Sequence, residues 1–229
     1  MKTQRINLID WKFGGFQSIL FVIIMKNIFD LEIRTSNVEG KIVAGFERLS
    51  QVFKVLLWEK AKKYDLSPIQ IQLLIFIKYH SKNKSTVSYL AKEFNLTKAT
   101  VSDTVKILEH KQYISKEIQP DDSRSYKVAL TPKGLEMVLL IEDFTDPLYD
   151  IVASTSKNDK LILWRTISSL LQQLNHLQII NLQNTCSNCH YYSEENKVKY
   201  CQLMNIKLES NDIRIDCSDH KPTIWTQIV

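Results

Sequence analysis

Hydrophobic residues in the first part of the chain recur at the spacing of an amphipathic helix. From position 36 onward they fall every three or four residues, which predicts a helix with one apolar face. Ser36 and Glu39 have the spacing of a capping box and mark its expected start. A second helix is expected to begin at Ser67-Pro68. Residues 69–77 behind it are apolar on nearly every side, so this helix should be central and buried.

The next segment predicts two short helices separated by a tight turn. The first covers about 87–94, the turn lies at 95–96, and the second begins at the N-cap residue Thr97 and ends near Lys111. This is the order of a helix-turn-helix, in which the second helix enters the major groove of DNA.

The second helix of this pair has one apolar and one polar face. Val101, Val105 and Leu108 are spaced to pack inward. The residues expected to face outward are Lys98, Thr100, Ser102, Asp103 and Lys106. Lysine suits phosphate or guanine, hydroxyls suit phosphate or either base edge, and aspartate suits a cytosine amine. Thr97 adds a capped helix N-terminus, which attracts phosphate. A solvated helix face explains this one helix equally well.

Beyond residue 112 the hydrophobic period changes from 3.6 to 2. Residues 113–118 and 126–130 predict two strands joined by a polar loop over 119–125. Arg124 stands in this loop beside Asp122, and Lys127 lies on the returning strand. An arginine held by a nearby carboxylate can be aimed at the minor groove. The hairpin therefore favours DNA binding over a merely solvated face.

Two long helices complete the body of the chain. One begins at Thr131-Pro132 and is interrupted near Pro147, and the other begins at Ser156 with an apolar stripe that extends over 157–182. Such stripes are most often ordinary core, but this length suits a dimer seam.

The body resembles the MarR family of bacterial transcription regulators over roughly residues 36–183. The matching residues are Leu90-Ala91, Leu96 to Ser102, Leu108-Glu109, Tyr113-Ile114, Asp121 to Arg124, and Val128-x-Leu130-Thr131-x-x-Gly134. The resemblance implies a homodimer whose first and last body helices interlock and whose two winged lobes bind a pseudo-palindromic operator in double-stranded DNA. It places Thr97 to Lys106 in the major groove and Arg124 in the minor groove. One departure is Gln112, where the family commonly has glycine.

Composition argues against several other classes of protein. The 229 residues are 44% hydrophobic and 24% charged, an ordinary soluble balance, and five glycines and five prolines disfavour phosphate-binding glycine loops and β-sandwiches. The net charge of +5 is concentrated in 35–183, which holds twenty basic and sixteen acidic residues. We find no nucleophile–base constellation in the sequence. We therefore expect a cytoplasmic binding protein and not an enzyme.

All four cysteines lie in the last 44 residues of the chain. Their pattern is Cys186-x2-Cys189-x11-Cys201-x15-Cys217, with His220 as an alternate ligand. A tail over 184–229 with few large apolar groups is hard to fold by burial alone, so a bound metal would stabilise it. One CxxC pair with two isolated thiols favours an iron–sulfur cluster over zinc, which usually uses two paired knuckles. A thiol–disulfide switch is the alternative.

The N-terminal 34 residues are an extension of uncertain status. The apolar run 16–25 is too short to span a bilayer, and no small-x-small cleavage site follows it. We expect either that Met25 is the true start or that the run is a membrane or partner-binding segment.

The sequence as a whole predicts a mainly α fold with a small β-hairpin wing (α+β). We expect a winged helix-turn-helix with long dimerisation helices over 35–183 and a small metal-binding tail over 184–229, acting as a DNA-binding regulator with a redox- or metal-sensing site. One alternative is a regulator that responds to a small-molecule effector, with Trp58, Tyr64 and Tyr79 lining the pocket and structural zinc in the tail. Another is an iron–sulfur redox or assembly protein built on a winged-helix scaffold.

Overall fold

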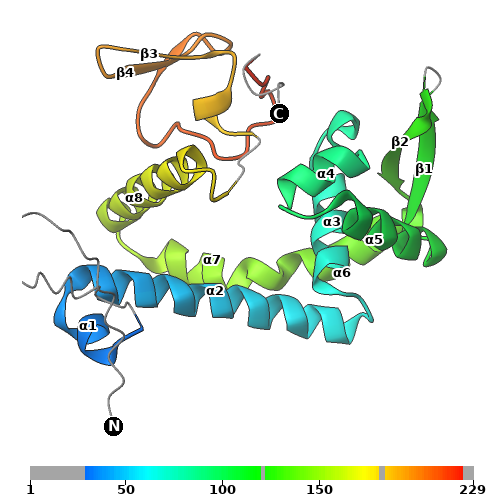
Figure 1. The fold of residues 1–229 in the computed structure, drawn as a ribbon, viewed down its shortest axis with the longest axis horizontal. Coiled ribbons are helices and arrows are strands. Elements are labelled where there is room, and N and C mark those ends of the chain that lie inside the picture. Colours follow the sequence, from blue (N-terminus) through cyan, green and yellow to red (C-terminus); the bar gives the residue numbers. More distant parts are fainter. Residues whose placement is uncertain (1–28, 120–121, 181–183, 224–229) are drawn as a thin grey trace, which may run out of the picture. The chain divides into compact units, whose positions relative to one another are not determined.

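The structure is a computed structural model that describes residues 29–119, 122–180 and 184–223 (Figure 1). The chain divides into two compact units with the boundary between Phe53 and Lys54, inside the long helix α2. The predicted N-terminal extension falls almost wholly outside the described residues. Among the described residues, no helix is both long and apolar enough to cross a membrane.

The first unit contains α1 (Leu31–Ser36) and the first part of α2 (Val38–Lys63). The prediction that Ser36 caps the long helix was wrong, because Ser36 is the last residue of α1. Asn37 takes this role instead, and its Oδ1 accepts a hydrogen bond of 2.6 Å from the backbone N–H of Gly40. Asparagine is as good an N-cap as serine, so the cap lies one residue after the predicted one.

In its described part, the second unit continues with six helices, a hairpin, three short 3₁₀ turns and the small sheet of the tail. Its elements up to the tail are α3 (Pro68–Tyr79), η1 (Lys82–Lys84), α4 (Val87–Glu93), α5 (Lys98–His110), β1 (Ile114–Gln119), β2 (Asp122–Leu130), α6 (Pro132–Ile141), η2 (Glu142–Thr145), α7 (Asp146–Ser154) and α8 (Lys157–His176). Threonine or serine side chains cap α5, α6 and α8 as the sequence indicated, Thr86 caps α4 without having been predicted, and Ser67 and Gln70 form a capping box at α3.

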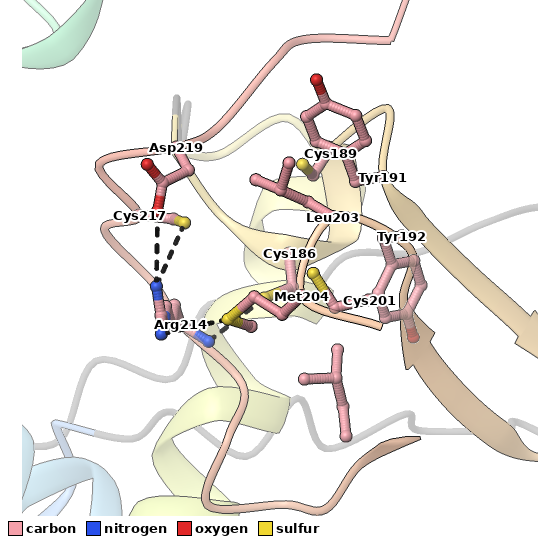
Figure 2. A pocket seen from close by; sticks show the side chains of 11 residues that line it. Cys186, Cys189, Tyr191, Tyr192, Cys201, Leu203, Met204, Arg214, Cys217 and Asp219 are labelled. Atoms are coloured by element: carbon pink, nitrogen blue, oxygen red, sulfur yellow. Dashed lines mark hydrogen bonds and ion pairs between the residues drawn. The ribbon is translucent and has the colours of Figure 1, made fainter. Parts of the chain in front are cut away.

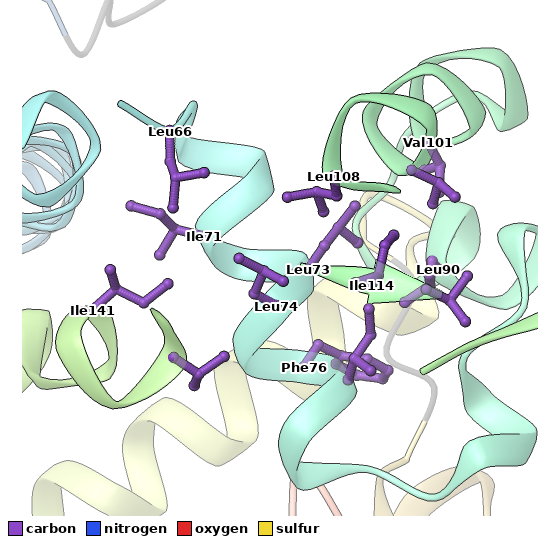
Figure 3. Close-up of a cluster of buried hydrophobic side chains, with 14 of the residues drawn as sticks. Leu66, Ile71, Leu73, Leu74, Phe76, Leu90, Val101, Leu108, Ile114 and Ile141 are labelled. Atoms are coloured by element: carbon purple, nitrogen blue, oxygen red, sulfur yellow. The ribbon is translucent and has the colours of Figure 1, made fainter. Parts of the chain in front are cut away.

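One apolar core joins α3 to the helices and the hairpin around it (Figure 3). The prediction that α3 is central is confirmed: Ile71, Leu73 and Leu74 have no exposed surface. Leu108 of α5 and Ile141 of α6 meet the same core. Burying such side chains contributes roughly 1.5–3 kcal/mol each, so this core fixes the positions of α4, α5 and the hairpin.

The hairpin differs in length from the prediction. β2 begins at Asp122, so the expected loop over 119–125 is wrong, and the register shifts between Ile118 and Gln119. The segment 122–125 is wholly polar, and hydrophobic alternation therefore gave no sign of a strand there.

Two residues at the base of the hairpin explain local sequence features. Gln112 adopts a left-handed backbone with φ of 62°, which is the conformation that favours glycine. Gly134 packs its Cα against the carbonyl group of Tyr113, and a Cβ at this position would overlap the Tyr113 oxygen. The Thr131-x-x-Gly134 pattern thus allows α6 to begin in direct contact with Tyr113, the residue that precedes β1.

The helix α8 ends earlier than its apolar stripe suggested. Its last residue is His176, and Gln178 turns the chain with φ of 58°. Left-handed residues terminate helices independently of hydrophobic pattern, so the stripe overestimated the helix by several residues.

The tail forms a small antiparallel sheet that the sequence did not predict. After the 3₁₀ turn η3 (Cys186–Asn188) come β3 (Tyr192–Glu195), β4 (Val198–Cys201) and β5 (Ile206–Leu208), hydrogen-bonded in the order β3-β4-β5. Asn196 and Lys197 form the tight turn between β3 and β4, both with positive φ. Leu208 is the buried apolar residue of this sheet.

Candidate nucleic-acid interface and cysteine-lined pocket

The helices α4 and α5 form the predicted helix-turn-helix. Leu90 of α4 and Val101, Val105 and Leu108 of α5 are fully buried, which confirms the inward face of the second helix. Thr104 is also buried, and its hydroxyl donates a hydrogen bond of 2.8 Å to the Thr100 carbonyl oxygen. Sequence periodicity did not single out Thr104.

The outward face of α5 presents the expected polar side chains together. Lys98, Thr100, Asp103 and Lys106 are exposed, and Ser102 is half-buried. Thr97 caps the helix: its Oγ1 accepts a hydrogen bond of 3.1 Å from the backbone N–H of Thr100.

Asp103 forms a salt bridge with Lys106 in which Nζ and Oδ1 are 2.9 Å apart. The hydrogen bond from Lys106 to this carboxylate raises the pKa of Lys106, so its ammonium stays charged. Asp103 therefore orients Lys106 in the free protein. The same ion pair offsets the negative charge of the Asp103 carboxylate, which would otherwise repel a DNA phosphate.

Lys92 on α4 adds a cation that the sequence analysis missed. Lys92 and Lys98 line a surface hollow at the turn of the helix-turn-helix, together with Ser88 and Asn95. Both lysines are exposed. Lys92 lies near the end of α4, close to the turn, and its position there is visible in the sequence as a cation before the turn.

The wing lies beside these helices, and its base is held by polar contacts. Lys127 donates a hydrogen bond of 2.7 Å to Asn83 Oδ1, and the backbone N–H of Val128 donates one of 2.9 Å to the Ser85 carbonyl oxygen. On β1, Lys116 forms an ion pair of 2.5 Å with Glu109. Arg124 belongs to β2, but its side chain lies outside the described part of the chain.

The four cysteines line one small pocket in the tail, of about 20 Å³ (Figure 2). Cys186 and Cys189 flank the turn η3, Cys201 ends β4, and Cys217 lies in the loop after β5. All four are half-buried free thiols. The sequence spacing therefore identified residues that the fold brings to one place.

The backbone of Arg214 holds Cys186 through two hydrogen bonds. The Cys186 Sγ accepts a hydrogen bond of 3.3 Å from the backbone N–H of Arg214, and its own N–H donates to the Arg214 carbonyl oxygen at 3.0 Å. Burial raises the pKa of the Cys186 thiol. Across residues 29–119, 122–180 and 184–223, no group of three or more His, Cys, Asp or Glu side chains is arranged to hold a metal ion.

Arg214 is the cation of this pocket and was not anticipated. Its guanidinium donates to Cys217 Sγ at 3.7 Å and to Met204 Sδ at 3.4 Å, and it lies 3.9 Å from the Asp219 carboxylate (Figure 2). The hydrogen bond to Cys217 raises the pKa of Arg214, so its guanidinium stays charged beside the sulfur. No spacing rule links an isolated arginine to a cysteine knuckle, so only the fold reveals it.

His220, the alternate ligand, does not line the cysteine pocket. Its Nε2 lies 2.8 Å from Asn188 Oδ1 and 3.2 Å from the Asn188 carbonyl oxygen. Burial lowers the pKa of His220.

The tail contacts the helix-turn-helix lobe through three polar side chains. Tyr89 of α4 donates a hydrogen bond of 2.8 Å to Asn184 Oδ1, His80 Nε2 lies 2.8 Å from Asp216 Oδ2, and Lys84 donates to the Cys217 carbonyl oxygen at 3.4 Å. Burial raises the pKa of Tyr89 to about 12. Asn184 is only 2% exposed, so this is a packed contact.

The three aromatic residues suggested as an effector pocket have separate environments. Trp58 is 53% exposed, Tyr64 packs against the core, and the Tyr79 hydroxyl donates a hydrogen bond of 2.8 Å to Glu142.

Comparison with known proteins supports the fold and the family resemblance. Residues 64–125 match the model of the MarR family. The chain is 31% identical over 91 residues to the HTH-type transcriptional regulator BilQ of Clostridioides difficile, a match that covers 39% of this chain and 60% of that relative's length.

Two solved structures show the same fold as the body of the chain. The Staphylococcus aureus MepR–DNA complex matches with a TM-score of 0.52 and 22% identity, over 58% of this chain and 97% of that one. Streptococcus pneumoniae FabT in complex with DNA matches with a TM-score of 0.50 and 24% identity, over 59% and 99%. The predicted winged helix-turn-helix fold is confirmed.

Proposed function

We propose that this chain, which carries a MarR-family winged helix-turn-helix domain, is a DNA-binding transcription regulator that acts as a homodimer. The observation that carries the proposal is the outward face of α5, where a capped N-terminus, hydroxyls and two lysines lie on a helix fixed by a fully buried opposite face. The DNA in the MepR and FabT complexes and the regulator function named for BilQ support the same reading.

The side chains of this face have distinct roles on DNA. Lys98 and Lys92, which flank the turn, contact phosphates and set the register of the lobe. Thr100 and Ser102 read base edges from the first two turns of α5. When DNA approaches, it competes with Asp103 for the Lys106 ammonium, which then contacts a guanine or a phosphate. Arg124 and Lys127 serve the wing, with Arg124 directed to the minor groove.

Homodimerisation is supported by apolar side chains that the single chain leaves exposed. On α2, Ile42, Phe46, Leu49 and Phe53 follow one another at helical spacing and are each 41–48% exposed. Contiguous apolar surface of this kind marks an interface in soluble proteins. Two lobes related by a twofold axis would bind two half-sites of a pseudo-palindrome.

Affinity measurements on a selected DNA test this proposal. Duplexes enriched from a random library by the full chain provide the probe, and fluorescence anisotropy gives the dissociation constants. We expect Lys106→Ala to weaken binding at least about fivefold, since one good base contact is worth roughly 1–3 kcal/mol. Lys207→Ala is the matched control, because Lys207 lies on β5 and pairs with Glu209. Failure to enrich any duplex, or equal affinity of both variants, contradicts the proposal.

We further propose that the four cysteines hold a metal centre, an iron–sulfur cluster in preference to zinc. Their convergence on one pocket supports this, as does the backbone N–H directed at Cys186 Sγ. Four soft thiolates suit either group, and binding would release their protons and stabilise a tail whose described sheet has one buried apolar residue. The centre would supply a redox or metal-supply signal.

The contacts between tail and lobe give this signal a route to DNA binding. Cys217 and its neighbour Asp216 lie at the contacts with Lys84 and His80, which precede the N-cap of α4. A change at Cys217 therefore acts on the segment that enters the helix-turn-helix.

Elemental analysis and an absorption spectrum of anaerobically purified protein test the metal centre. Iron with sulfide and a visible band supports the cluster, and zinc without a visible band supports the alternative metal. Cys186→Ala should lose the metal, whereas Ser218→Ala, next to Cys217 on the tail surface, should retain it. Absence of both metals from the wild-type protein refutes the metal centre.

A further inference from the structure

A second pocket of about 270 Å³ lies between α8 and the tail, next to the cysteines but distinct from their own pocket. Helix α8 contributes Arg165, Ser168 and Gln172, and the tail contributes Lys199 and Arg214. The proposal that follows does not depend on the DNA-binding function.

The charges around this pocket are unbalanced. Arg165, Lys199 and Arg214 line it, and none of the described residues that line it is acidic. Arg214 is partly neutralised by Asp219 at 3.9 Å. Among the described residues, Arg165 and Lys199 have no hydrogen-bond or ion-pair partner. Glu194 lies across the strand pair from Lys199, but its carboxylate accepts a hydrogen bond of 2.8 Å from the Tyr192 hydroxyl. Gathering like charges in a concavity costs free energy, and a bound anion removes this cost.

Ser168 gives a second, independent sign of a ligand. Its Oγ is buried and makes no hydrogen bond to any residue that the structure describes. The neighbouring hydroxyls of α8 are satisfied within the helix, because Thr166 donates to the Ile162 carbonyl oxygen and Ser169 pairs with Gln173. A buried hydroxyl without a partner costs about 1–3 kcal/mol, and a ligand oxygen that reached Ser168 in the wall of this pocket would remove that cost.

The remaining walls indicate an organic molecule. Leu171, Ile213 and Ile215 line the same pocket as the cations. A fully hydrated inorganic ion gains nothing from such a surface, whereas the carbon skeleton of an organic acid buries its apolar atoms there.

We propose that this pocket binds a small organic anion, whose acidic group is held by Arg165 and Lys199 with Ser168 and whose apolar body rests on Leu171, Ile213 and Ile215. Because Cys186 and Arg214 line both pockets, the ligand links α8 to the cysteine site. The chain thereby has a ligand input at the tail, away from Trp58, Tyr64 and Tyr79.

Calorimetric titration of the full chain with cyclohexanecarboxylate tests the pocket, with cyclohexanecarboxamide as a neutral probe of the same shape. We expect one site per chain for the carboxylate and at least about tenfold weaker binding of the amide. Arg165→Gln and Lys199→Gln should each weaken carboxylate binding at least about tenfold, as expected for a lost charge-assisted hydrogen bond. Lys207→Gln removes a tail lysine that does not line the pocket, and should leave the affinity unchanged.

Ser168→Ala separates a ligand role from a structural one. Because Ser168 Oγ has no partner in the free protein, the variant should keep its stability towards urea while binding the carboxylate about threefold or more weakly. Trp164 offers a second readout, since its indole N–H donates to the carbonyl oxygen of Ser210 on the pocket wall at 3.1 Å. Its fluorescence should change with the ligand, and Trp164→Phe should abolish that change.

Inorganic phosphate forms a further arm of the titration. If phosphate competes with the carboxylate, and if its binding is weakened by Arg165→Gln and Lys199→Gln, the same pocket is assigned to a phosphorylated organic ligand. The proposal is overturned if neither anion binds at millimolar concentration, or if binding is the same in wild type, Arg165→Gln and Lys199→Gln.

Discussion

Replacing Gly134 by alanine should uncouple the wing from the body of the lobe. A Cβ at this position would overlap the carbonyl oxygen of Tyr113 and lie 2.8 Å from its carbonyl carbon and 3.2 Å from its Cα. All three atoms belong to the backbone, so no side chain can rotate to make room. The same carbonyl oxygen accepts a hydrogen bond of 3.1 Å from the Thr131 N–H, which ties α6 to the wing.

The expected cost of this substitution is at least about 2–3 kcal/mol, at the upper end of values for an added methyl group in a packed site. Urea unfolding at fixed protein concentration measures it through the shift in midpoint. Glu136→Ala on the same helix is the control: Glu136 is exposed, and its loss should change stability by less than about 0.5 kcal/mol. A Gly134→Ala protein as stable as Glu136→Ala would refute the close approach of α6 and the wing.

Three further substitutions test other contacts. Tyr89→Phe removes the hydroxyl that donates to the buried Asn184 amide oxygen, so it should lower the free energy of unfolding by about 1–3 kcal/mol and speed hydrogen exchange in the tail. Tyr149→Phe is the control, because the Tyr149 ring is exposed and its variant should change neither quantity. Hydrogen bonds from Lys78 and then Tyr79 lower the pKa of Glu142. The Glu142 carboxylate therefore stabilises the fold fully above the unfolded pKa of 4.5, and this stabilisation is lost as the pH falls through the lower folded pKa. Glu142→Gln should flatten the acid part of a plot of urea midpoint against pH, and an unchanged acid slope would contradict the assignment. Phe46→Glu places a charge in the apolar stripe of α2 and should shift the mass measured by light scattering from dimer to monomer, while an unaltered dimer would remove this stripe from the interface.

The sequence was most informative where caps and burial agree. Thr97 and Thr131 cap the helices they were expected to cap, and Val101, Val105 and Leu108 are buried as their spacing required. Capping and hydrophobic spacing are both set by residues near one another in the sequence, and a helix with one fully buried face has few other ways to pack.

The errors arose where the determining contact is not periodic. The end of α8 depends on the left-handed residue Gln178, and the strand at Asp122 lies in a polar stretch without alternation. Arg214, Lys199 and Ser168 come together from separate elements, so neither tail pocket could be assembled from spacing alone. The cysteine positions were the exception, because thiols are rare enough to be grouped by composition.

The salt dependence of DNA binding tests most directly that α5 meets DNA. The slope of log K against log salt counts the phosphates that cations neutralise, at about 0.9 per phosphate. Lys98 lies at the start of α5 and occurs twice in the proposed homodimer, so Lys98→Ala should make the slope shallower by about two units, and Lys207→Ala should leave it unchanged. Identical slopes for wild type and Lys98→Ala would contradict the placement of this helix on DNA.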